Sequence, residues 1–377
     1  MMTRPRHVPQ DIVTQALLNL DRTTVIIAGV ASYDELPPLN GPSWDMEMVA
    51  EIIVENEMIS LFDEDKVIEL ENPSNSRFRK AIADYAQGRS ARGDILILYF
   101  SGHGCILPSG SFGFCLKDTR LGAEGTGVLP ITVVSIDELV GTLAIPDVHP
   151  VFILDSCFSS VTSPQGAAAG TTMVEETLRS SNADTFALLA SSSSYSVSID
   201  TPDGGAFTQA FYSILLNGLS DATGRRSPFV TLNQLAAPLQ EELSRMGVPL
   251  SRCYVGRDFP VLPIAKNSSF RPQSESFTPY MKRIIELLWQ NGSPKEAQLS
   301  EFSEKIGQGA YANHSKLSLD PWALAEDAGL NRVRRLTTRG KQFARGRISI
   351  PKNIVRNPFT GEWIAASQAE TIRIDDV

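Results

Sequence analysis

The first 265 residues repeat one pattern that restricts the fold strongly: short β-branched runs alternate with longer amphipathic segments. This alternation is typical of βα units, which place their strands in a mainly parallel sheet covered by helices on both faces. We therefore expect an α/β fold around a six-stranded sheet. The strands are predicted at residues 24–29, 66–70, 94–100, 148–154, 185–190 and 252–255.

Amphipathic segments between these strands predict five helices. They are expected at residues 43–57, 75–87, 135–143, 205–217 and 231–246. Two of the helices begin with capping-box spacing, in which Ser or Thr stands three residues before Glu or Gln. These boxes are Ser135 with Glu138, and Thr231 with Gln234.

The distribution of charge divides the chain. Residues 271–377 hold 16 Lys and Arg against 12 Asp and Glu, an excess of four positive charges. Since the whole chain has a net charge of −9, residues 1–270 carry −13. The polar stretch KNSSFRPQSESFTP marks the change. We predict an N-terminal extension at 1–22, an acidic first domain at 23–265 and a basic second domain at 277–377.

The composition, 42 % hydrophobic and 20 % charged, is ordinary for a globular protein. The longest apolar runs, VIIAGVA and ILILYF, are too short to cross a bilayer. The N-terminus lacks a continuous apolar stretch of signal-peptide length. We expect a cytoplasmic protein without a membrane partner.

Four cysteines, Cys105, Cys115, Cys157 and Cys253, are spread along the chain without CxxC spacing. This spacing argues against a disulfide framework and against a zinc site. Because there is also no Gly-rich phosphate loop or cluster of metal ligands, we expect neither metal nor cofactor. One cysteine, however, lies in a setting that favours chemistry.

Two of the predicted strands end beside a reactive side chain. The run DILILYF is followed by SGHG, which contains His103, and the run VFIL is followed by DSCFS, which contains Cys157. Ligands of open α/β sheets bind beyond the carboxyl ends of the strands, so His103 and Cys157 are expected to meet there. An imidazole within hydrogen-bond reach can take the proton of a thiol and leave a strong nucleophile.

The glycines on both sides of His103 predict a tight turn and a Gly104 amide that is free to donate. The amides of Gly104 and Cys157 are the candidate donors to the oxyanion that forms when a carbonyl is attacked. Alone, His103 could be a turn histidine and Cys157 a small buried residue; together they favour catalysis. Cys105 is a weaker candidate nucleophile, because a neighbour in the same turn would not face the imidazole.

With these motifs the sequence resembles the caspase-like cysteine peptidases, which include caspases, metacaspases and stand-alone bacterial relatives. His103 and Cys157 are 54 residues apart, and caspases place the histidine about 50 residues before the cysteine. DSCFS has the metacaspase-like form, and VIIAGVASYDELPPLNGPSWD is similar to the opening of these peptidases. FALLASSSSYS and GGAFTQAF are similar to their pocket strand and the following helix. The resemblance covers about residues 23–264 and implies the caspase fold, with His103 as base and Cys157 as nucleophile.

The resemblance also implies a substrate pocket. Asp155 stands where metacaspases receive a basic side chain, which favours cleavage after Arg or Lys. Ser191, Ser193 and Tyr195 occupy the pocket strand, where family members often carry acidic residues and a Gln. The alternative is that Asp155 only caps its loop by accepting hydrogen bonds from nearby amides.

Between two predicted strands, residues 159–182 are small, polar and poor in apolar periodicity, which indicates an exposed connection. Caspase-like zymogens are commonly processed between a larger and a smaller segment. The resemblance therefore implies cleavage after Arg179, by the protein itself or by another protease. The alternative is that Arg179 is an ordinary solvated residue.

The second domain has a different pattern. The segment PYMKRIIELLWQNG predicts an amphipathic helix, and RISIPKNIV and TGEWIAAS predict short strands, which together indicate a small, winged-helix-like α+β domain. Nine basic residues and no acidic one lie between Ala328 and Gly361. They are Arg332, Arg334, Arg335, Arg339, Lys341, Arg345, Arg347, Lys352 and Arg356. Such a stripe can bind nucleic acid through phosphates, but it can also be a solvated face or dock on the acidic domain, and we favour regulation or partner recognition.

Two classes of function follow. The first is a controlled cysteine endopeptidase that acts on proteins, as bacterial relatives do in stress or antiviral defence. The second is a catalytically inactive caspase-like protein that binds a partner or nucleic acid through its basic domain. Some metacaspases need calcium; the sequence has no EF-hand-like loop and neither supports nor excludes that requirement.

Overall fold

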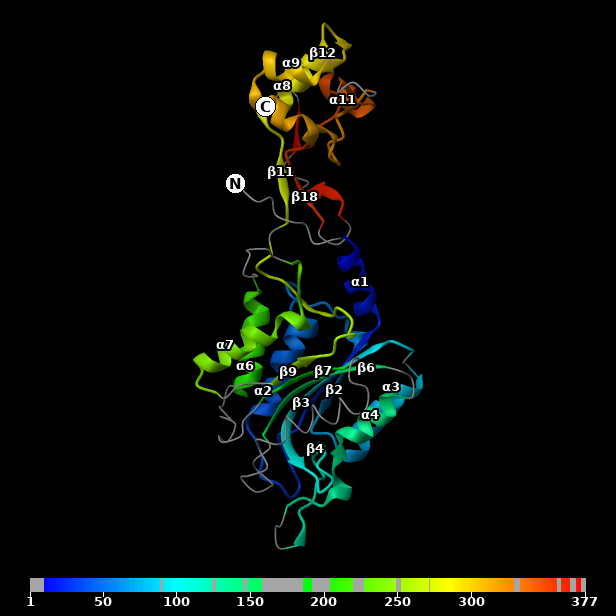
Figure 1. Ribbon diagram of the computed structural model, residues 1–377, viewed down its shortest axis with the longest axis vertical. Coiled ribbons are helices and arrows are strands. Elements are labelled where there is room, and N and C mark those ends of the chain that lie inside the picture. The colour runs from blue at the N-terminus through cyan, green and yellow to red at the C-terminus, as the bar shows by residue number, and fades with distance from the viewer. Residues whose placement is uncertain are drawn as a thin grey trace. The chain divides into compact units, whose positions relative to one another are not determined.

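The computed structural model describes most of the chain. The described residues are 10–88, 91–123, 127–144, 148–157, 186–191, 204–219, 227–248, 252–270, 272–328, 333–357, 361–366 and 371–373. The chain forms two compact units, Met1–Phe270 and Arg271–Val377 (Figure 1). Each unit is described by itself below.

One sheet organises the first unit. Its main strands, in spatial order, are β2 (Val67–Glu71), β1 (Thr23–Gly29), β3 (Ile95–Ile106), β6 (His149–Cys157), β7 (Ala187–Ala190) and β9 (Arg252–Val255). All neighbours are parallel except β7 and β9, which are antiparallel. The prediction of a mainly parallel sheet with these six strands is confirmed.

Helices cover both faces of this sheet (Figure 1). One face carries α2 (Gly41–Ala50), α6 (Ala206–Asn217) and α7 (Ala236–Arg245), and the other carries α3 (Asn75–Gly88) and α4 (Ile136–Ala144). Side chains of a strand alternate between the two faces. Val25 and Ile27 of β1 therefore enter the core under α2, whereas Ile26 enters the core under α3.

Of the two predicted capping boxes, the one at Ser135 shows one of its two hydrogen bonds, and the one at Thr231 shows both. At the start of α4, the Ser135 hydroxyl accepts from the Glu138 amide at 3.1 Å. Thr231 and Gln234 form both hydrogen bonds of the box and open a short 3₁₀ turn ahead of α7. The helix expected at 43–57 is divided into α2 and a π-helical turn at Glu51–Glu55.

Two strands run further than the sequence predicts. Strand β3 continues past Phe100, and β6 continues past Leu154. Past the end of β1, the antiparallel strand β4 (Phe112–Phe114) supplies hydrogen bonds to β3, and β5 (Val134–Ser135) pairs with β4. The tight turn predicted at His103 is therefore wrong: His103 lies within an extended strand.

The segment predicted as an N-terminal extension contains helix α1 (Gln10–Asp21). The Asn19 side-chain amide donates to the Val261 carbonyl at 2.8 Å, and Ala16 is buried. Near that end of the unit, β8 (Phe229–Thr231) and β10 (Pro263–Lys266) form an antiparallel pair. Helix α1 is thus attached to the first unit by specific contacts.

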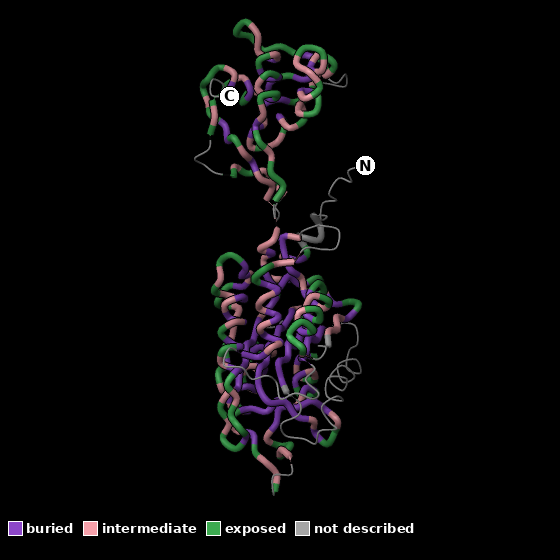
Figure 2. Tube along the Cα trace, turned by 90° about the vertical axis from the view of Figure 1, so that its left-hand side faces the viewer, coloured by how far each residue is buried: buried purple, intermediate pink, exposed green. Residues whose placement is uncertain are grey.

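The second unit has its own apolar core (Figure 2). Its helices are α8 (Pro279–Leu288), α9 (Leu299–Lys305), α10 (Gln308–Asn313) and α11 (Thr338–Ala344). Trp322 is fully buried among them, donates from Nε1 to the Pro351 carbonyl at 2.6 Å, and meets Phe277 edge to face. The amphipathic helix predicted from PYMKRIIELLWQNG is α8.

Short antiparallel strands complete the second unit. They are β11 (Ser274–Ser276), β18 (Asn353–Arg356) and β19 (Trp363–Ala365) in one sheet; β14 (Ala297–Gln298), β16 (Val333–Leu336) and β15 (Ala325–Asp327) in another; and the pairs β12 (Trp289–Gln290) with β13 (Ser293–Pro294) and β17 (Ile350–Pro351) with β20 (Thr371–Ile372). The expected strands in RISIPKNIV and TGEWIAAS are β17, β18 and β19. This unit is a strand-rich α+β region.

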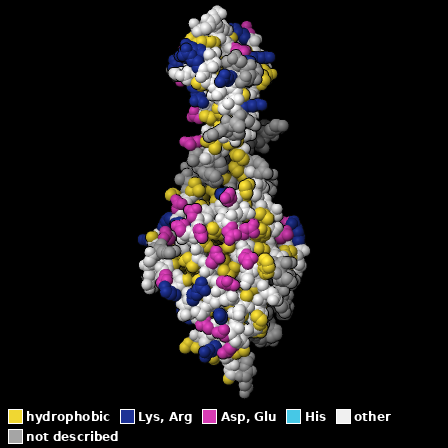
Figure 3. All heavy atoms as spheres, turned by 180° about the vertical axis from the view of Figure 1, so that it is seen from behind, with side chains coloured by type: hydrophobic (Ala, Val, Ile, Leu, Met, Phe, Trp, Pro, Cys, Tyr) yellow, Lys and Arg dark blue, Asp and Glu magenta, His cyan; other side chains and the backbone are white. Residues whose placement is uncertain are grey.

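Charge differs between the units. Figure 3 shows Asp and Glu side chains gathered on one face of the first unit.

Within the described ranges, no helix is both long enough and apolar enough to span a bilayer.

Candidate active site

His103 and Cys157 lie on neighbouring parallel strands. In the register of β3 and β6 they are direct partners. They form the last of nine consecutive pairs, of which the first is Ile95 with His149. Neighbouring strands are about 4.8 Å apart, and register partners point to the same face of the sheet. The two residues that the sequence singled out are therefore adjacent. The Cys157 side chain itself lies outside the described part of the structure.

The imidazole of His103 is buried, and one of its nitrogens contacts the backbone. Its Nε2 lies 2.9 Å from the carbonyl oxygen of Pro37, and the residue is 2 % exposed. Since a carbonyl only accepts hydrogen bonds, Nε2 must carry the proton of this contact. The neutral ring then has Nδ1 as its proton-accepting nitrogen, as a general base requires.

Tyr33 fixes His103 in a second way. Its ring packs against the imidazole with centroids 4.8 Å apart, and its hydroxyl accepts from the His103 amide at 2.8 Å. Tyr33 and Pro37 belong to the VIIAGVASYDELPPL segment quoted for the family resemblance, but sequence reasoning gave neither a role. The Tyr33 hydroxyl and the Pro37 carbonyl each contact His103, and no spacing pattern in the sequence reveals these contacts.

The glycines flanking His103 are required by packing and not by a turn. A Cβ on Gly104 would lie 2.5 Å from the Phe112 ring, and a Cβ on Gly102 would lie 2.9 Å from the Tyr33 hydroxyl. Phe112 and Tyr33 therefore occupy the space that side chains would fill. Glycine lets the backbone approach these rings closely.

The orientation of the Gly104 amide follows from the β3–β4 ladder. Cys115 N donates to His103 O at 3.1 Å, and Leu107 N donates to Ser111 O at 2.9 Å, so both positions are hydrogen-bonded pairs. Gly104 lies opposite Phe114 in a non-hydrogen-bonded pair, whose N–H groups point away from the partner strand. The Gly104 amide is thus directed to the side on which β6 carries Cys157.

The other cysteines have structural surroundings. Cys105 and Cys115 are fully buried in a small apolar cluster with Leu36 and Val133. A hydrogen bond between the Cys115 and Cys105 thiols, together with burial, raises the pKa of Cys115 well above its ordinary value. Burial raises the pKa of Cys253 to about 11. Cys115 and Cys253 are therefore poor nucleophiles, because the reactive form is the thiolate.

Asp155 lies at the carboxyl end of β6, two residues before Cys157. Its side chain is buried, and Oδ2 accepts from the Thr208 hydroxyl at 2.7 Å and from the Thr208 amide at 3.2 Å. Burial raises the pKa of Asp155, while hydrogen bonds from Thr208 and Ser191 oppose the rise. Thr208 in turn is 2.6 Å from the Tyr99 hydroxyl. The residue is a buried carboxyl group held by neutral donors.

A second carboxyl group was missed by sequence reasoning. Asp45 of α2 is 2 % exposed; its Oδ2 accepts from the Ser101 hydroxyl at 2.6 Å and its Oδ1 from the Gly205 amide at 2.7 Å. The sequence gave one signal, the Asp on the first helix in GPSWD, without a contact partner.

Gly205 brings the two carboxyl groups into one place. A Cβ on this residue would lie 2.3 Å from Oδ2 of Asp155 and 3.3 Å from Oδ2 of Asp45. Burial, with both carboxylates nearby, raises the pKa of Tyr99 well above its ordinary value. The start of α6 therefore closes over an acidic site between β3, β6 and α2.

Of the predicted pocket residues, the structure describes one besides Asp155. Ser191 follows β7, is buried, and donates from its amide to Leu154 O at 2.9 Å. Its side chain is a hydrogen-bond partner of Asp155. Ser193, Tyr195, Arg179 and the whole of 159–182 lie outside the described residues.

The basic residues of the second unit have diverse environments. Arg334 is 5 % exposed and lies 3.3 Å from Asp327, and Arg335 pairs with Glu326 at 2.8 Å. Arg345 stacks over Trp289 at 5.0 Å. Several of the nine cations are therefore engaged inside the unit and do not form one continuous solvated stripe.

The described residues include no group of three or more His, Cys, Asp or Glu side chains placed to hold a metal ion.

The chain has been compared with curated proteins, solved structures and protein-family models. No curated protein matches the chain. A crystal structure of protein GSU0716 from Geobacter sulfurreducens is similar at a TM-score of 0.41 and 18 % identity, over 62 % of this chain and 93 % of that chain. The family model for the caspase domain, peptidase C14, matches residues 22–244. Since this match spans more than half of the chain, the protein belongs to the caspase-domain family.

Proposed function

We propose that the protein is a cysteine endopeptidase that cleaves protein substrates after Arg or Lys. The observation that carries the proposal is the register pairing of His103 with Cys157, combined with the buried carboxyl groups of Asp155 and Asp45 at the same end of the sheet. Family membership supports the reaction class, and the acidic site supports the choice of a basic residue.

In the proposed reaction, Nδ1 of His103 takes the proton of the Cys157 thiol and the thiolate attacks the scissile carbonyl carbon. The amides of Gly104 and Cys157 donate to the oxyanion. The C–N bond breaks as His103 gives its proton to the leaving amine. Water, deprotonated by His103, then hydrolyses the thioester and restores the thiol.

The substrate's basic side chain would enter the site lined by Asp155, Asp45 and Ser191. A guanidinium or ammonium there supplies the counter-charge that a buried carboxylate lacks, and guanidinium can bind carboxylate with two parallel hydrogen bonds. Ser193 and Tyr195 are proposed to complete the pocket.

We propose that cleavage of the 159–182 segment after Arg179 activates the enzyme. The protein itself or an activating protease would make this cut. The protein is proposed to work in the cytoplasm in a stress or antiviral defence response, as the family resemblance implies. A calcium dependence belongs to the same test. The basic second unit is proposed to recognise a regulator; binding to nucleic acid is the weaker option, because Arg334, Arg335 and Arg345 have partners within the unit.

The test is hydrolysis of fluorogenic peptides ending in Arg, Lys or Asp, with and without calcium, by the intact chain and by chain nicked at Arg179. Cleavage after Arg or Lys that disappears in Cys157→Ala and His103→Ala, but persists in the thiol-loss control Cys253→Ser, is the expected result. Preference for Asp would overturn the pocket assignment. No turnover, together with no labelling of Cys157 by a thiol-reactive probe, would support the inactive binding protein instead.

A further inference from the structure

The outer edge of the sheet at β2 has properties that the proposed protease activity does not use. β2 is the terminal strand of the sheet and pairs only with β1 among the described strands. Such an edge presents unpaired N–H and C=O groups to which another extended chain can add. Native proteins usually cover or blunt an edge of this kind.

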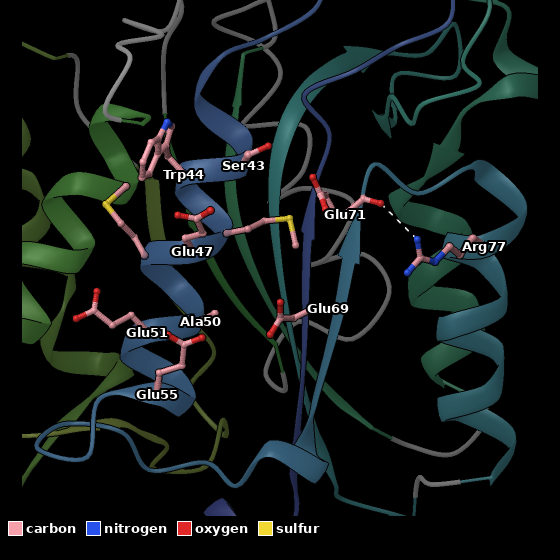
Figure 4. Close-up of a pocket in the computed structure, with 11 residues that line it drawn as sticks. Ser43, Trp44, Glu47, Ala50, Glu51, Glu55, Glu69, Glu71 and Arg77 are labelled. Carbon is pink, nitrogen blue, oxygen red and sulfur yellow. Dashed lines mark hydrogen bonds between the residues drawn. The ribbon is translucent and has the colours of Figure 1, made fainter.

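The register shows which groups face outward. Asn72 N donates to Gly29 O at 2.8 Å, so Asn72 faces β1, and the alternation of a parallel ladder turns Leu70 and Ile68 the same way. Glu69 and Glu71 therefore direct their N–H and C=O groups away from β1. The Glu71 carbonyl accepts from Arg77 at 3.4 Å, which leaves Glu69 at the centre of the edge (Figure 4).

The two faces of β2 differ in chemistry. On the α2 side lies a cleft of about 880 Å³. Figure 4 shows glutamates around it that come from α2, from the π-helical turn at Glu51–Glu55 and from β2. These are Glu47, Glu51, Glu55, Glu69 and Glu71. On the α3 side lies a smaller cleft of about 310 Å³, which is lined in part by Ile68, Leu70 and Tyr85.

The described part of the chain neutralises the acidic cleft poorly. Among the described residues that line the cleft, Arg77 alone is basic, and it contacts the Glu71 carbonyl. Glu51 accepts from the Tyr212 hydroxyl at 2.9 Å, whereas in the described ranges the carboxylates of Glu47 and Glu69 form no ion pair. Glutamates four residues apart on one helix repel each other, so this arrangement costs stability unless cations offset it.

We propose that the outer edge of β2 is a docking site for an extended segment of a partner protein in which Lys or Arg alternates with apolar residues. A residue added opposite Glu69 points to the same face as Glu69, so its side chain enters the acidic cleft. Its two neighbours point to the other face, beside Ile68 and Leu70. The backbone groups of Glu69 supply the hydrogen bonds of strand addition.

A second copy of this chain does not fit the edge. Antiparallel pairing of two β2 strands would set Glu69 or Glu71 against a glutamate of the other copy, and like charges directly opposite are destabilising. The edge therefore selects a basic segment over its own copy. The proposal does not depend on the protease activity.

The test uses the full chain carrying Cys157→Ala, so that a basic probe is not cut, and a fluorescein-labelled peptide with the repeat Lys-Val-Lys-Val-Lys-Val-Lys. Binding is measured by anisotropy. We expect Glu69→Pro to weaken binding about tenfold or more, because proline removes the outward N–H and leaves the ladder to β1 intact. Glu47→Lys is expected to weaken it by about the same factor, since it reverses one charge in the cleft.

A charge control and a local readout test whether the peptide binds at the β2 edge. Glu57→Lys makes the same charge change at an exposed position outside the cleft and should leave binding unchanged. Protection of the Glu69 amide from hydrogen exchange in the parent chain on peptide addition gives a readout that does not depend on the folding of Glu69→Pro. Equal binding by the parent, Glu69→Pro and Glu47→Lys, binding of a Glu-Val repeat as tight as that of the Lys-Val repeat, or no binding would each overturn the proposal.

Discussion

The two units bury charge in opposite ways. Asp155 in the first unit is 8 % exposed, and its described hydrogen-bond partners are the neutral groups of Thr208 and Ser191. Arg334 in the second unit is 5 % exposed, and it meets the Asp327 carboxylate at 3.3 Å and His314 Nδ1 at 3.3 Å. Among the described residues, Asp155 thus has no counter-charge, whereas Arg334 has one.

The difference separates a site from a structural contact. A buried charge without a counter-ion costs stability, and it persists where a ligand supplies the missing charge. A buried charge that is already paired needs no ligand. By this criterion Asp155 supports the proposed recognition of a basic side chain, while Arg334 serves to hold β15 against β16.

The largest expected effect is on activity. Asp155→Asn should lower kcat/KM for peptides ending in Arg by about a thousandfold, since the substrate cation loses a buried carboxylate partner. Asn can still accept from Thr208, so the unfolding transition should remain cooperative. The matched change in the other unit, Asp327→Asn, should leave kcat/KM unaltered. Retention of Arg cleavage within about threefold of the parent would make Asp155 a structural residue.

The next effect is on stability. Arg334→Ala should lower the free energy of unfolding of the second unit by about 2–3 kcal/mol, because it removes buried side-chain packing and leaves polar neighbours without a donor. Asp327→Ala should cost less than about 1 kcal/mol, since Asp327 is 68 % exposed and solvent screens the pair. Urea unfolding followed by tryptophan fluorescence measures both, because Trp289, Trp322 and Trp363 all lie in this unit. Equal losses in the two variants would contradict this view of Arg334.

A smaller effect concerns pH. Burial raises the folded-state pKa of Asp155 above its unfolded value, so the folded state holds the proton more strongly. Stability from this group is present below the unfolded pKa of about 3.9 and is lost as pH rises through the folded pKa. Asp155→Asn cannot lose that proton. The stability of the variant relative to the parent should therefore increase from pH 4 upward; a difference that is flat with pH would argue that Asp155 is not destabilised by burial.

Much of the first unit could be predicted from sequence because its signals are local. Each buried run became a strand, and capping residues such as Thr231 fixed a helix start. The pairing of His103 with Cys157 was also predictable, since both follow apolar strands of one parallel sheet. What failed was the end of β3: SGHGCI contains two glycines and little apolar periodicity, so nothing local shows that β4 will pair with it.

The contacts that complete the site were less accessible. Asp45 meets Gly205, which is 160 residues away in sequence, and Tyr33 meets His103 across 70 residues. Neither contact leaves a periodicity or a spacing pattern, because side-chain hydrogen bonds depend on the final packing of distant elements. The nine basic residues show the converse: Arg334 and Arg345 are close in sequence to the other cations, but they contact Asp327 and Trp289, and the sequence pattern does not reveal these contacts.

The smallest effect compares the two Tyr–His pairs. Tyr33 packs on His103 at 4.8 Å and accepts from its amide, whereas Tyr311 meets His314 at 5.5 Å in the second unit. Tyr33→Phe keeps the ring and removes one hydrogen bond, worth about 1 kcal/mol, so kcat/KM should fall about fivefold. Tyr311→Phe should leave kcat/KM unchanged. If Tyr33→Phe also matches the parent, the ring alone positions His103 and the hydroxyl contact serves only the strand.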